Sequence, residues 1–175
     1  MNEALKRPPL SQRTIRKAVY GIGIGVHSGE KVRITLRPGH TDSGIQFIRS
    51  DIKGAAPIQA CAENVADTTL STSVANGGVS VATVEHLMSA LWGLGIDNLL
   101  VELSAEEVPI MDGSAAPFID MVESAGMAAI EQKAQQGTSL MVELWEQWLE
   151  PLGFSLHTPR DPTQRGGHIT LRHPD

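Results

Sequence analysis

The sequence predicts an α+β fold, in which a small β-sheet packs against two helices and a short α/β tail follows. Three observations support this class. Residues 31–36 alternate polar and apolar side chains, which is the two-residue period of a half-buried strand. Asn76-Gly77, between two segments with β-branched residues, is a hairpin signal. Residues at about 80–92 and 114–126 instead repeat apolar side chains at helical spacing.

The composition fits one ordinary domain, or one domain with an appendage. The chain has 175 residues, of which 41% are hydrophobic and 4% aromatic, so the core must be mainly aliphatic. The net charge is −6 and the basic residues form no long run, which argues against general nucleic-acid binding. Cys61 has no partner for an intrachain disulfide. We expect no membrane span, no signal peptide and a cytoplasmic location, since no long apolar run occurs.

The N-terminal part predicts mostly strands. We expect residues 1–12 to be a flexible N-terminus and residues 14–20 to form the first strand. Glycines alternate with apolar residues at 21–26, which suits a strand approached closely by another backbone, or a bulged turn. This stretch is not a phosphate loop, because no helix opens after a G-x-G-x-x-G pattern and no Gly-Lys-Ser/Thr follows. Further strands are expected at 31–36, 45–49, 58–65 and 67–74.

The middle of the chain predicts a helix within residues 80–98, after a short strand at 79–81. Its apolar face consists of Val84, Leu87, Met88 and Leu91, and Gly93 and Gly95 end it. A largely apolar strand at 98–103 and a loop at 106–113 follow. The second helix is expected from about 115 to 126, with Ser114 as its N-cap and Pro117 in its first turn.

The character of the chain changes after Gly126. Residues 128–138 are small and polar, and we interpret them as a linker or junction. Residues 140–149 form an amphipathic pattern that holds two tryptophans, and short strands are expected at 154–157 and 168–171.

The adjacent Glu85 and His86 are the first candidates for chemistry. A neutral imidazole is a good zinc ligand, and a neighbouring carboxylate can accept a proton. Adjacent helical residues point about 100° apart, so both side chains could border one pocket. Taken alone, however, such a pair is more often a solvated surface feature, and a zinc site needs at least three protein ligands. No second histidine lies nearby to complete the motif.

Other polar residues have ordinary structural interpretations. His27 lies in a glycine-rich stretch and is better interpreted as a turn histidine. Asp112 more readily shapes a turn or caps the following helix than binds a ligand. Cys61 is interpreted as a small buried hydrophobic residue. Arg160, Arg165 and Arg172 are interpreted as solvated.

Five blocks of this sequence, in this order and spacing, resemble one enzyme family. They include Gly-Ile-Gly-Val-His-Ser-Gly-Glu-Lys-Val, Asp-Thr-Thr-Leu-Ser-Thr, Thr-Val-Glu-His-Leu, Gly-Leu-Gly-Ile-Asp-Asn and Val-Pro-Ile-Met-Asp-Gly-Ser-Ala-Ala-Pro-Phe. Residues 11–130 closely resemble the N-terminal half of UDP-3-O-acyl-N-acetylglucosamine deacetylase, a zinc enzyme of lipid A biosynthesis. The resemblance implies one of two similar α+β domains, with an active site between them.

The resemblance also implies roles for individual residues. His86 would be the zinc ligand that the N-terminal domain supplies, and Glu85 the general base that activates the zinc-bound water. Leu70 and Ser71 match positions that line the catalytic cleft, and His27 matches a histidine near the site. The implied substrate is a UDP-linked acylated N-acetylglucosamine.

The resemblance covers only half of that family's site. The other zinc ligands, a His and an Asp of a His-Lys-x-x-Asp-x-x-Gly-Asp segment, belong to the family's second domain and are missing here. The Zn²⁺ ligand set of this chain is therefore incomplete, and we expect the chain alone to be inactive. The alternative is a non-catalytic fusion fragment, or a module that binds a partner through the face that the second domain normally covers.

The tail resembles a different family. Residues 139–175 resemble a fragment of the C-terminal domain of kynureninase, a pyridoxal-phosphate enzyme, without its cofactor-binding lysine segment. We therefore divide the chain into a deacetylase N-terminal domain at 13–127, a junction at 128–138 and this fragment. A gene fusion, an assembly error or an artificial join would each explain the junction.

Overall fold

The computed structural model of the chain describes residues 11–133. This part contains ten strands, two α-helices and one short 3-10 helix. The strands are β1 (Ser11–Ile15), β2 (Val19–Ile24), β3 (Lys31–Pro38), β4 (Ile45–Arg49), β5 (Ile58–Gln59), β6 (Val65–Asp67), β7 (Ser73–Asn76), β8 (Val79–Val81), β9 (Leu99–Leu103) and β10 (Met127–Lys133). The helices are η1 (Ala62–Asn64), α1 (Glu85–Leu94) and α2 (Ala116–Ala125).

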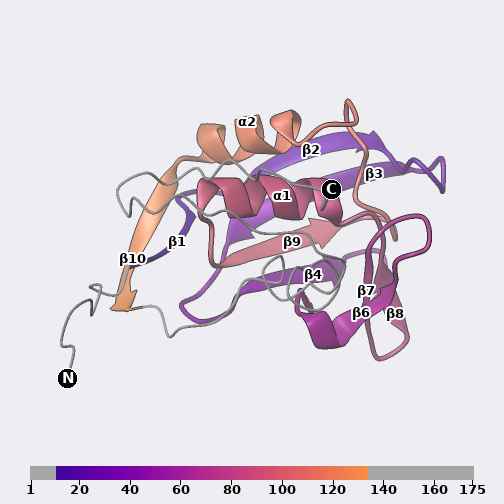
Figure 1. Cartoon of the computed structure of the whole chain (residues 1–175), viewed down its shortest axis with the longest axis horizontal. Helices are drawn as coiled ribbons and strands as arrows, with labels where there is room; N and C mark the ends of the chain where they lie inside the picture. The colour runs from indigo at the N-terminus through magenta and orange to yellow at the C-terminus, as the bar shows by residue number, and fades with distance from the viewer. Residues whose placement is uncertain (1–10, 134–175) are drawn as a thin grey trace, which may run out of the picture.

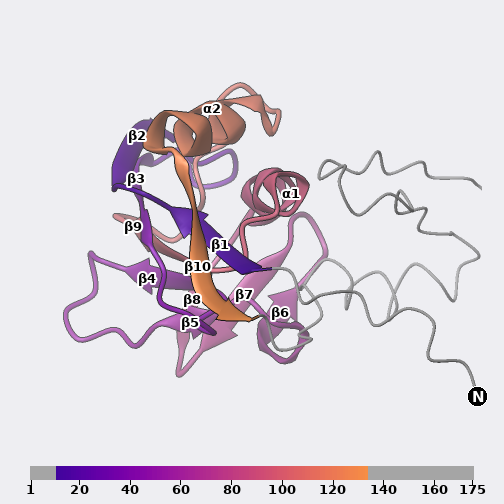
Figure 2. The same ribbon diagram turned by 90° about the vertical axis from the view of Figure 1, so that its left-hand side faces the viewer.

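The main sheet has the strand order β2-β3-β9-β4-β5 (Figure 1). Its neighbouring strands are antiparallel, except that β4 and β9 run parallel. Both helices lie on one side of this sheet, as the edge-on view shows (Figure 2). The predicted α+β class, with a sheet packed against two helices, is confirmed.

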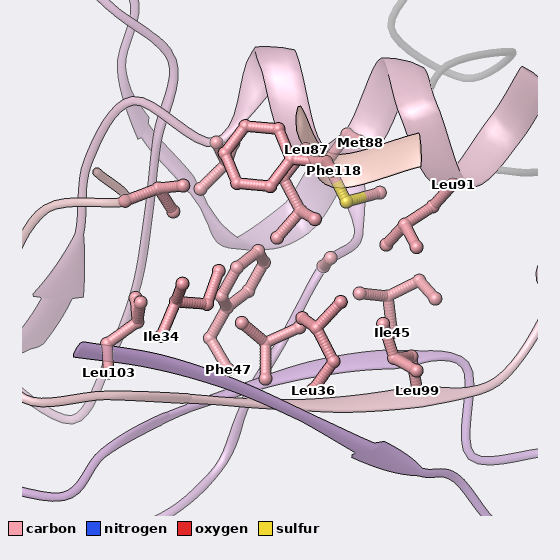
Figure 3. Packing of buried hydrophobic residues seen from close by; sticks show 14 of the residues in the cluster. Ile34, Leu36, Ile45, Phe47, Leu87, Met88, Leu91, Leu99, Leu103 and Phe118 are labelled. Carbon is pink, nitrogen blue, oxygen red and sulfur yellow. The ribbon is translucent and has the colours of Figure 1, made fainter. Parts of the chain in front are cut away.

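The core lies between the helices and the main sheet. Leu87, Met88 and Leu91 of α1 and Phe118 of α2 point toward strand residues such as Phe47 (Figure 3). Phe47, Phe118 and Leu87 are completely buried. Burying a large apolar side chain contributes roughly 1.5–3 kcal/mol, so this layer supplies much of the fold's stability.

Strand β2 has glycines on its inner face and apolar side chains on its outer face. A Cβ at Gly21 would lie 3.2 Å from Met121 Sδ of α2, and one at Gly23 would lie 2.8 Å from Pro109 Cβ. Ile22 and Ile24, between and after these glycines, are exposed. This stretch lies in a strand, as predicted, but side chains of α2 and of the loop after β9, rather than another backbone, approach its glycines.

Two short β units flank the main sheet. β7 and β8 form the hairpin predicted at Asn76-Gly77, and β6 pairs with β7 on the other side. β1 pairs antiparallel with β10, with Ile15 opposite Met127. No helix among residues 11–133 has the length and apolar character needed to cross a membrane.

Several predicted element boundaries are wrong. The strand predicted at 14–20 is two strands, because β1 pairs with β10 whereas β2 pairs with β3, and the chain bends between them. Arg16 N–H donates to the Gly126 carbonyl at this bend. The helix predicted from residue 80 begins at Glu85, because residues 79–81 pair with β7, Ala82 forms a bridge with Glu107, and Thr83 has a positive φ. The strand predicted at 67–74 is interrupted by a loop at 68–72.

The two ends of the described part also differ from the expected flexible segments. Gln12, placed in the flexible N-terminus, lies in β1 and is 5% exposed. It accepts a hydrogen bond from Asn98 Nδ2 at 2.6 Å. Residues 127–133, most of which were interpreted as linker, form β10, because β1 offers an unpaired edge. The elements predicted at 140–149, 154–157 and 168–171 lie outside the described residues.

Candidate functional site

The candidate site begins where the chain passes from β8 into α1. Thr83 has a φ of 58°, a backbone conformation that is unusual for a β-branched residue, and it turns the chain into the helix. Glu85 is the first residue of α1 and His86 the second, and both are half-buried. Side chains of the first helical turn are thereby presented at the end of the helix, beside the hairpin.

The loop 68–72 is tied to the start of α1 by two hydrogen bonds. Glu85 Oε2 accepts from Thr72 N–H at 3.2 Å, and Val84 N–H donates to the Thr72 carbonyl at 3.2 Å. This loop contains both predicted cleft residues. Ser71 is half-buried, whereas Leu70 is 80% exposed, the highest value among the exposed large hydrophobic residues.

Asp67 gives this loop its shape. Its Oδ1 accepts from Thr69 N–H at 3.0 Å and from Thr69 Oγ1 at 2.7 Å. These bonds form a turn of the kind that Asp side chains make with the backbone two residues on. The Thr69 hydroxyl and then its N–H lower the pKa of Asp67.

A buried carboxylate connects a third segment to the start of α1. Glu107 is 1% exposed, and its two oxygens accept four donors. These are Thr83 Oγ1 at 2.8 Å, Ser28 Oγ at 2.9 Å, Ser28 N–H at 3.0 Å and His27 N–H at 3.2 Å. A Cβ at Gly25 would overlap Ser28 Oγ and Glu107 Oε2, so only glycine fits there. Burial raises the pKa of Glu107, but these hydrogen bonds together lower it below its ordinary value.

Glu107 was not among the site residues predicted from the sequence. Its partners lie 24 to 80 positions away along the chain, so no local pattern marks it. The available signal is weak: two adjacent acids, Glu106 and Glu107, follow an apolar strand, and one of them must fit against the core. Glu106 is the exposed one.

The predicted site residues therefore lie on three segments that share hydrogen bonds. Glu85 and His86 are on α1, Leu70 and Ser71 are in the loop held by Thr72, and His27 is in the turn held by Glu107. The His27 side chain itself is exposed. The structure thus joins, around one helix end, residues that are far apart in the sequence.

The described residues do not form a complete metal shell. No group of three or more His, Cys, Asp or Glu that could hold a metal ion occurs within residues 11–133. Catalytic zinc takes three protein ligands, and His86 is one imidazole. The donor set of this part of the chain therefore does not by itself fit a zinc ion.

Asp112 has the turn role that the sequence predicted. Its Oδ1 accepts from Ser114 N–H at 2.9 Å and from Ser114 Oγ at 2.8 Å. The Ser114 hydroxyl oxygen in turn accepts from Ala116 N–H at 3.1 Å. The N-cap position is Ala115 rather than Ser114, but the Ser114 side chain still satisfies a first-turn N–H. Cys61, expected to be buried, is half-buried, and burial raises the pKa of its thiol.

The chain is similar to two known families. Residues 12–151 match the model of the UDP-3-O-acyl N-acetylglycosamine deacetylase family, and residues 130–175 match that of the kynureninase C-terminal domain. The two matches overlap over residues 130–151. A protein of Teredinibacter turnerae named UDP-3-O-acyl-N-acetylglucosamine deacetylase is 58% identical over 118 residues, covering 67% of this chain and 39% of that protein.

A second relative aligns over more of the chain. The Thioalkalivibrio sulfidiphilus protein of the same name is 44% identical over 165 residues, covering 94% of this chain and 53% of that protein. These matches define the class as deacetylase-related. The chain belongs to the UDP-3-O-acyl N-acetylglycosamine deacetylase family. It spans about half or less of the length of the curated relatives that it matches.

Proposed function

We propose that this chain supplies one half of the active site of a zinc-dependent deacetylase that acts on UDP-3-O-acyl-N-acetylglucosamine in lipid A biosynthesis. Membership of the deacetylase family supports the reaction class. The observation that carries the proposal is the position of Glu85 and His86, half-buried together at the start of α1 and beside a fixed loop. A proton acceptor and a metal-binding imidazole next to each other suit amide hydrolysis.

Each predicted site residue has a role in this proposal. His86 supplies one ligand for zinc, which when bound would polarise the acetamide carbonyl. Glu85 accepts a proton from the attacking water, and that proton is available to the leaving amine when the C–N bond breaks. The products are acetate and the free amine of the sugar. Leu70, Ser71 and His27 line the cleft that holds the substrate.

The same proposal assigns the missing ligands to a polypeptide segment outside this chain. One imidazole cannot hold zinc as a three-ligand catalytic site does, so we expect the chain alone to be inactive.

The domain limits stay part of the proposal: a deacetylase domain at 13–127, a junction at 128–138 and a kynureninase-like fragment at 139–175 that contributes no activity. The strand β10 argues for extending the first unit to Lys133.

The alternative function is a non-catalytic fragment that binds a partner. In this alternative, a partner would cover the loop 68–72, in which the Leu70 side chain is 80% exposed. The two functions differ in one result: only the first requires that a complementary polypeptide restore turnover.

A complementation experiment tests the proposal. The chain is assayed for zinc content and for acetate release from UDP-3-O-acyl-N-acetylglucosamine, alone and mixed with the separately produced C-terminal part of the Teredinibacter turnerae relative. We expect no turnover alone and measurable turnover in the mixture. His86→Ala should abolish that turnover, whereas His40→Ala, which changes an exposed histidine in the turn after β3, should leave it intact.

Two results would contradict the proposal. One tightly bound zinc per chain together with normal turnover alone would overturn the expectation of inactivity. A mixture that forms a stable complex without turnover would favour the non-catalytic alternative.

A further inference from the structure

The turn that contains His27 is held in place by hydrogen bonds rather than by packing. Residues 26–30 are all exposed, so apolar burial does not hold them. The turn is closed internally by Gly25 N–H donating to the Glu30 carbonyl and by Gly29 N–H donating to the Gly25 carbonyl, each at 2.9 Å. Its side-chain attachment to the rest of the molecule is the Glu107 carboxylate, which accepts from His27 N–H, Ser28 N–H and Ser28 Oγ.

The same carboxylate holds the residue that leads into α1. Thr83, 3% exposed, donates its hydroxyl to Glu107 Oε1 at 2.8 Å, two positions before Glu85. Thr83 also has the positive φ that redirects the chain, and such a conformation persists only where its surroundings stabilise it. Glu107 therefore bonds at once to the His27 turn and to the approach to Glu85 and His86.

The charge of Glu107 is balanced by hydrogen-bond donors. Within residues 11–133 the two ion pairs join Arg37 to Glu102 and Arg49 to Asp51, and neither includes Glu107. A buried carboxylate without a cation is costly unless several donors solvate it. The backbone N–H groups of His27 and Ser28 can only donate, and both reach Glu107 Oε2. A glutamine would offer them a single neutral oxygen in place of the charged carboxylate, which weakens these bonds.

We infer that Glu107 is a positioning residue, whose carboxylate fixes the His27 turn against the start of α1 and so sets the geometry between His27 and the Glu85–His86 pair. The inference rests on the proposed function, in which these three side chains border one cleft. Glu107 is too deeply buried to touch substrate and acts through the two segments that it joins.

The test compares Glu107→Gln with Glu106→Gln, which makes the same change at the exposed neighbour. Amide hydrogen exchange is followed by NMR in the full chain. In Glu107→Gln the amides of His27 and Ser28 should exchange at least about tenfold faster, because each loses a charged acceptor. The amide of Val101, in the central strand β9, should keep its rate, and Glu106→Gln should match the parent throughout.

A second pair of variants guards against loss of folding in Glu107→Gln. Thr83→Val removes the hydroxyl at similar volume, whereas Thr83→Ser retains it. Thr83→Val should speed exchange at His27 and Ser28 by a smaller factor, and Thr83→Ser should restore protection. Unchanged exchange at these two amides, or equal acceleration at Val101 in both Glu107→Gln and Thr83→Val, would overturn the inference.

Kinetics of the complemented mixture separate positioning from general stability. Glu107→Gln should lower kcat about tenfold or more, with KM within about twofold, because substrate binding survives while the reacting groups are misaligned. Faster exchange with an unchanged kcat would overturn the positioning role. If the unmodified mixture has no turnover, the proposed function fails, and a positioning role for the reaction fails with it, although the exchange data would still establish the attachment of the turn.

Discussion

The two helices have the same length but begin in different ways. Both α1 and α2 have 10 residues, and neither has a side-chain hydrogen bond from its N-cap residue. The start of α2 is local: Asp112 bonds to Ser114, and the Ser114 hydroxyl accepts from Ala116, each two positions along the chain. The start of α1 is not local, because Thr83 and Glu85 bond to residues 24 and 13 positions away.

This difference separates a helix start that is stabilised by its own turn from one that joins distant segments of the chain. The turn before α2 satisfies its own first-turn amide and shapes one segment. The polar side chains at α1 instead hold the loop that ends at Thr72 and, through Glu107, the turn of His27. The three segments that contain the predicted site residues are therefore joined at the start of α1, while α2 packs in the core.

The largest effects should be equal for the two helices, because both bury their apolar faces in one core. Phe118→Ala in α2 should lower the free energy of unfolding by about 3–5 kcal/mol, and Leu87→Ala in α1 by about 2–5 kcal/mol. Both side chains are completely buried. Urea unfolding followed by circular dichroism measures this, and a loss below about 1 kcal/mol for Leu87→Ala would contradict the shared core.

The helix starts should differ in the next largest effect. Thr83→Val should cost about 1–3 kcal/mol, since it removes a donor from the buried Glu107. Ser114→Ala should cost about 1 kcal/mol, the usual value for a lost cap interaction. The same urea titration measures both variants. Ser104→Ala is not a suitable control, because the Ser104 hydroxyl itself accepts a hydrogen bond from Arg33 N–H. If both variants lost the same free energy of unfolding, the long-range bond from Thr83 to Glu107 would contribute no extra stability.

Substitutions at the C-terminal ends of the two helices should change stability by a smaller amount. Gly95 ends α1 with φ 64° and ψ 43°, in the left-handed region, whereas Gly126 ends α2 with φ 71° and ψ 144°. Alanine tolerates the first conformation better than the second. Gly126→Ala should therefore cost about 1–2 kcal/mol and Gly95→Ala about 1 kcal/mol, measured as shifts of the urea midpoint at constant slope. The reverse order would contradict this account.

The smallest effect is confined to acidic solution. Burial raises the pKa of Glu107 but its hydrogen bonds lower it more, and the Ser114 hydroxyl lowers the pKa of Asp112. The unfolded chain therefore binds more protons, so stability is present above pH of about 4 and falls as pH decreases through the lowered values. In Glu107→Gln and in Asp112→Asn, the free energy of unfolding should decrease less as the pH is lowered. The difference from the parent should be smaller for Asp112→Asn, because Asp112 is exposed. If the free energy of unfolding of Glu107→Gln depended on acidic pH as it does in the parent, the lowered pKa of Glu107 would be contradicted.

The elements that the sequence predicted correctly are those with local causes. The alternation at 31–36 marks β3, the Asn76-Gly77 signal marks the β7–β8 hairpin, and the second helix lies within a residue of its predicted limits. The errors lie where pairing partners are distant. The break between β1 and β2 follows from pairing with different strands, and β10 exists because β1 offers its edge.

The sequence by itself determined the α+β class, the hairpin, the apolar faces of both helices and, through its motif blocks, the family. Side-chain period and turn chemistry act over a few residues, so they can be read along the chain. Only the tertiary structure decided that the His27 turn, the loop 68–72 and the start of α1 are joined. It also identified Glu107 as the carboxylate that joins two of them, because a buried charge is stabilised by donors that only folding brings together.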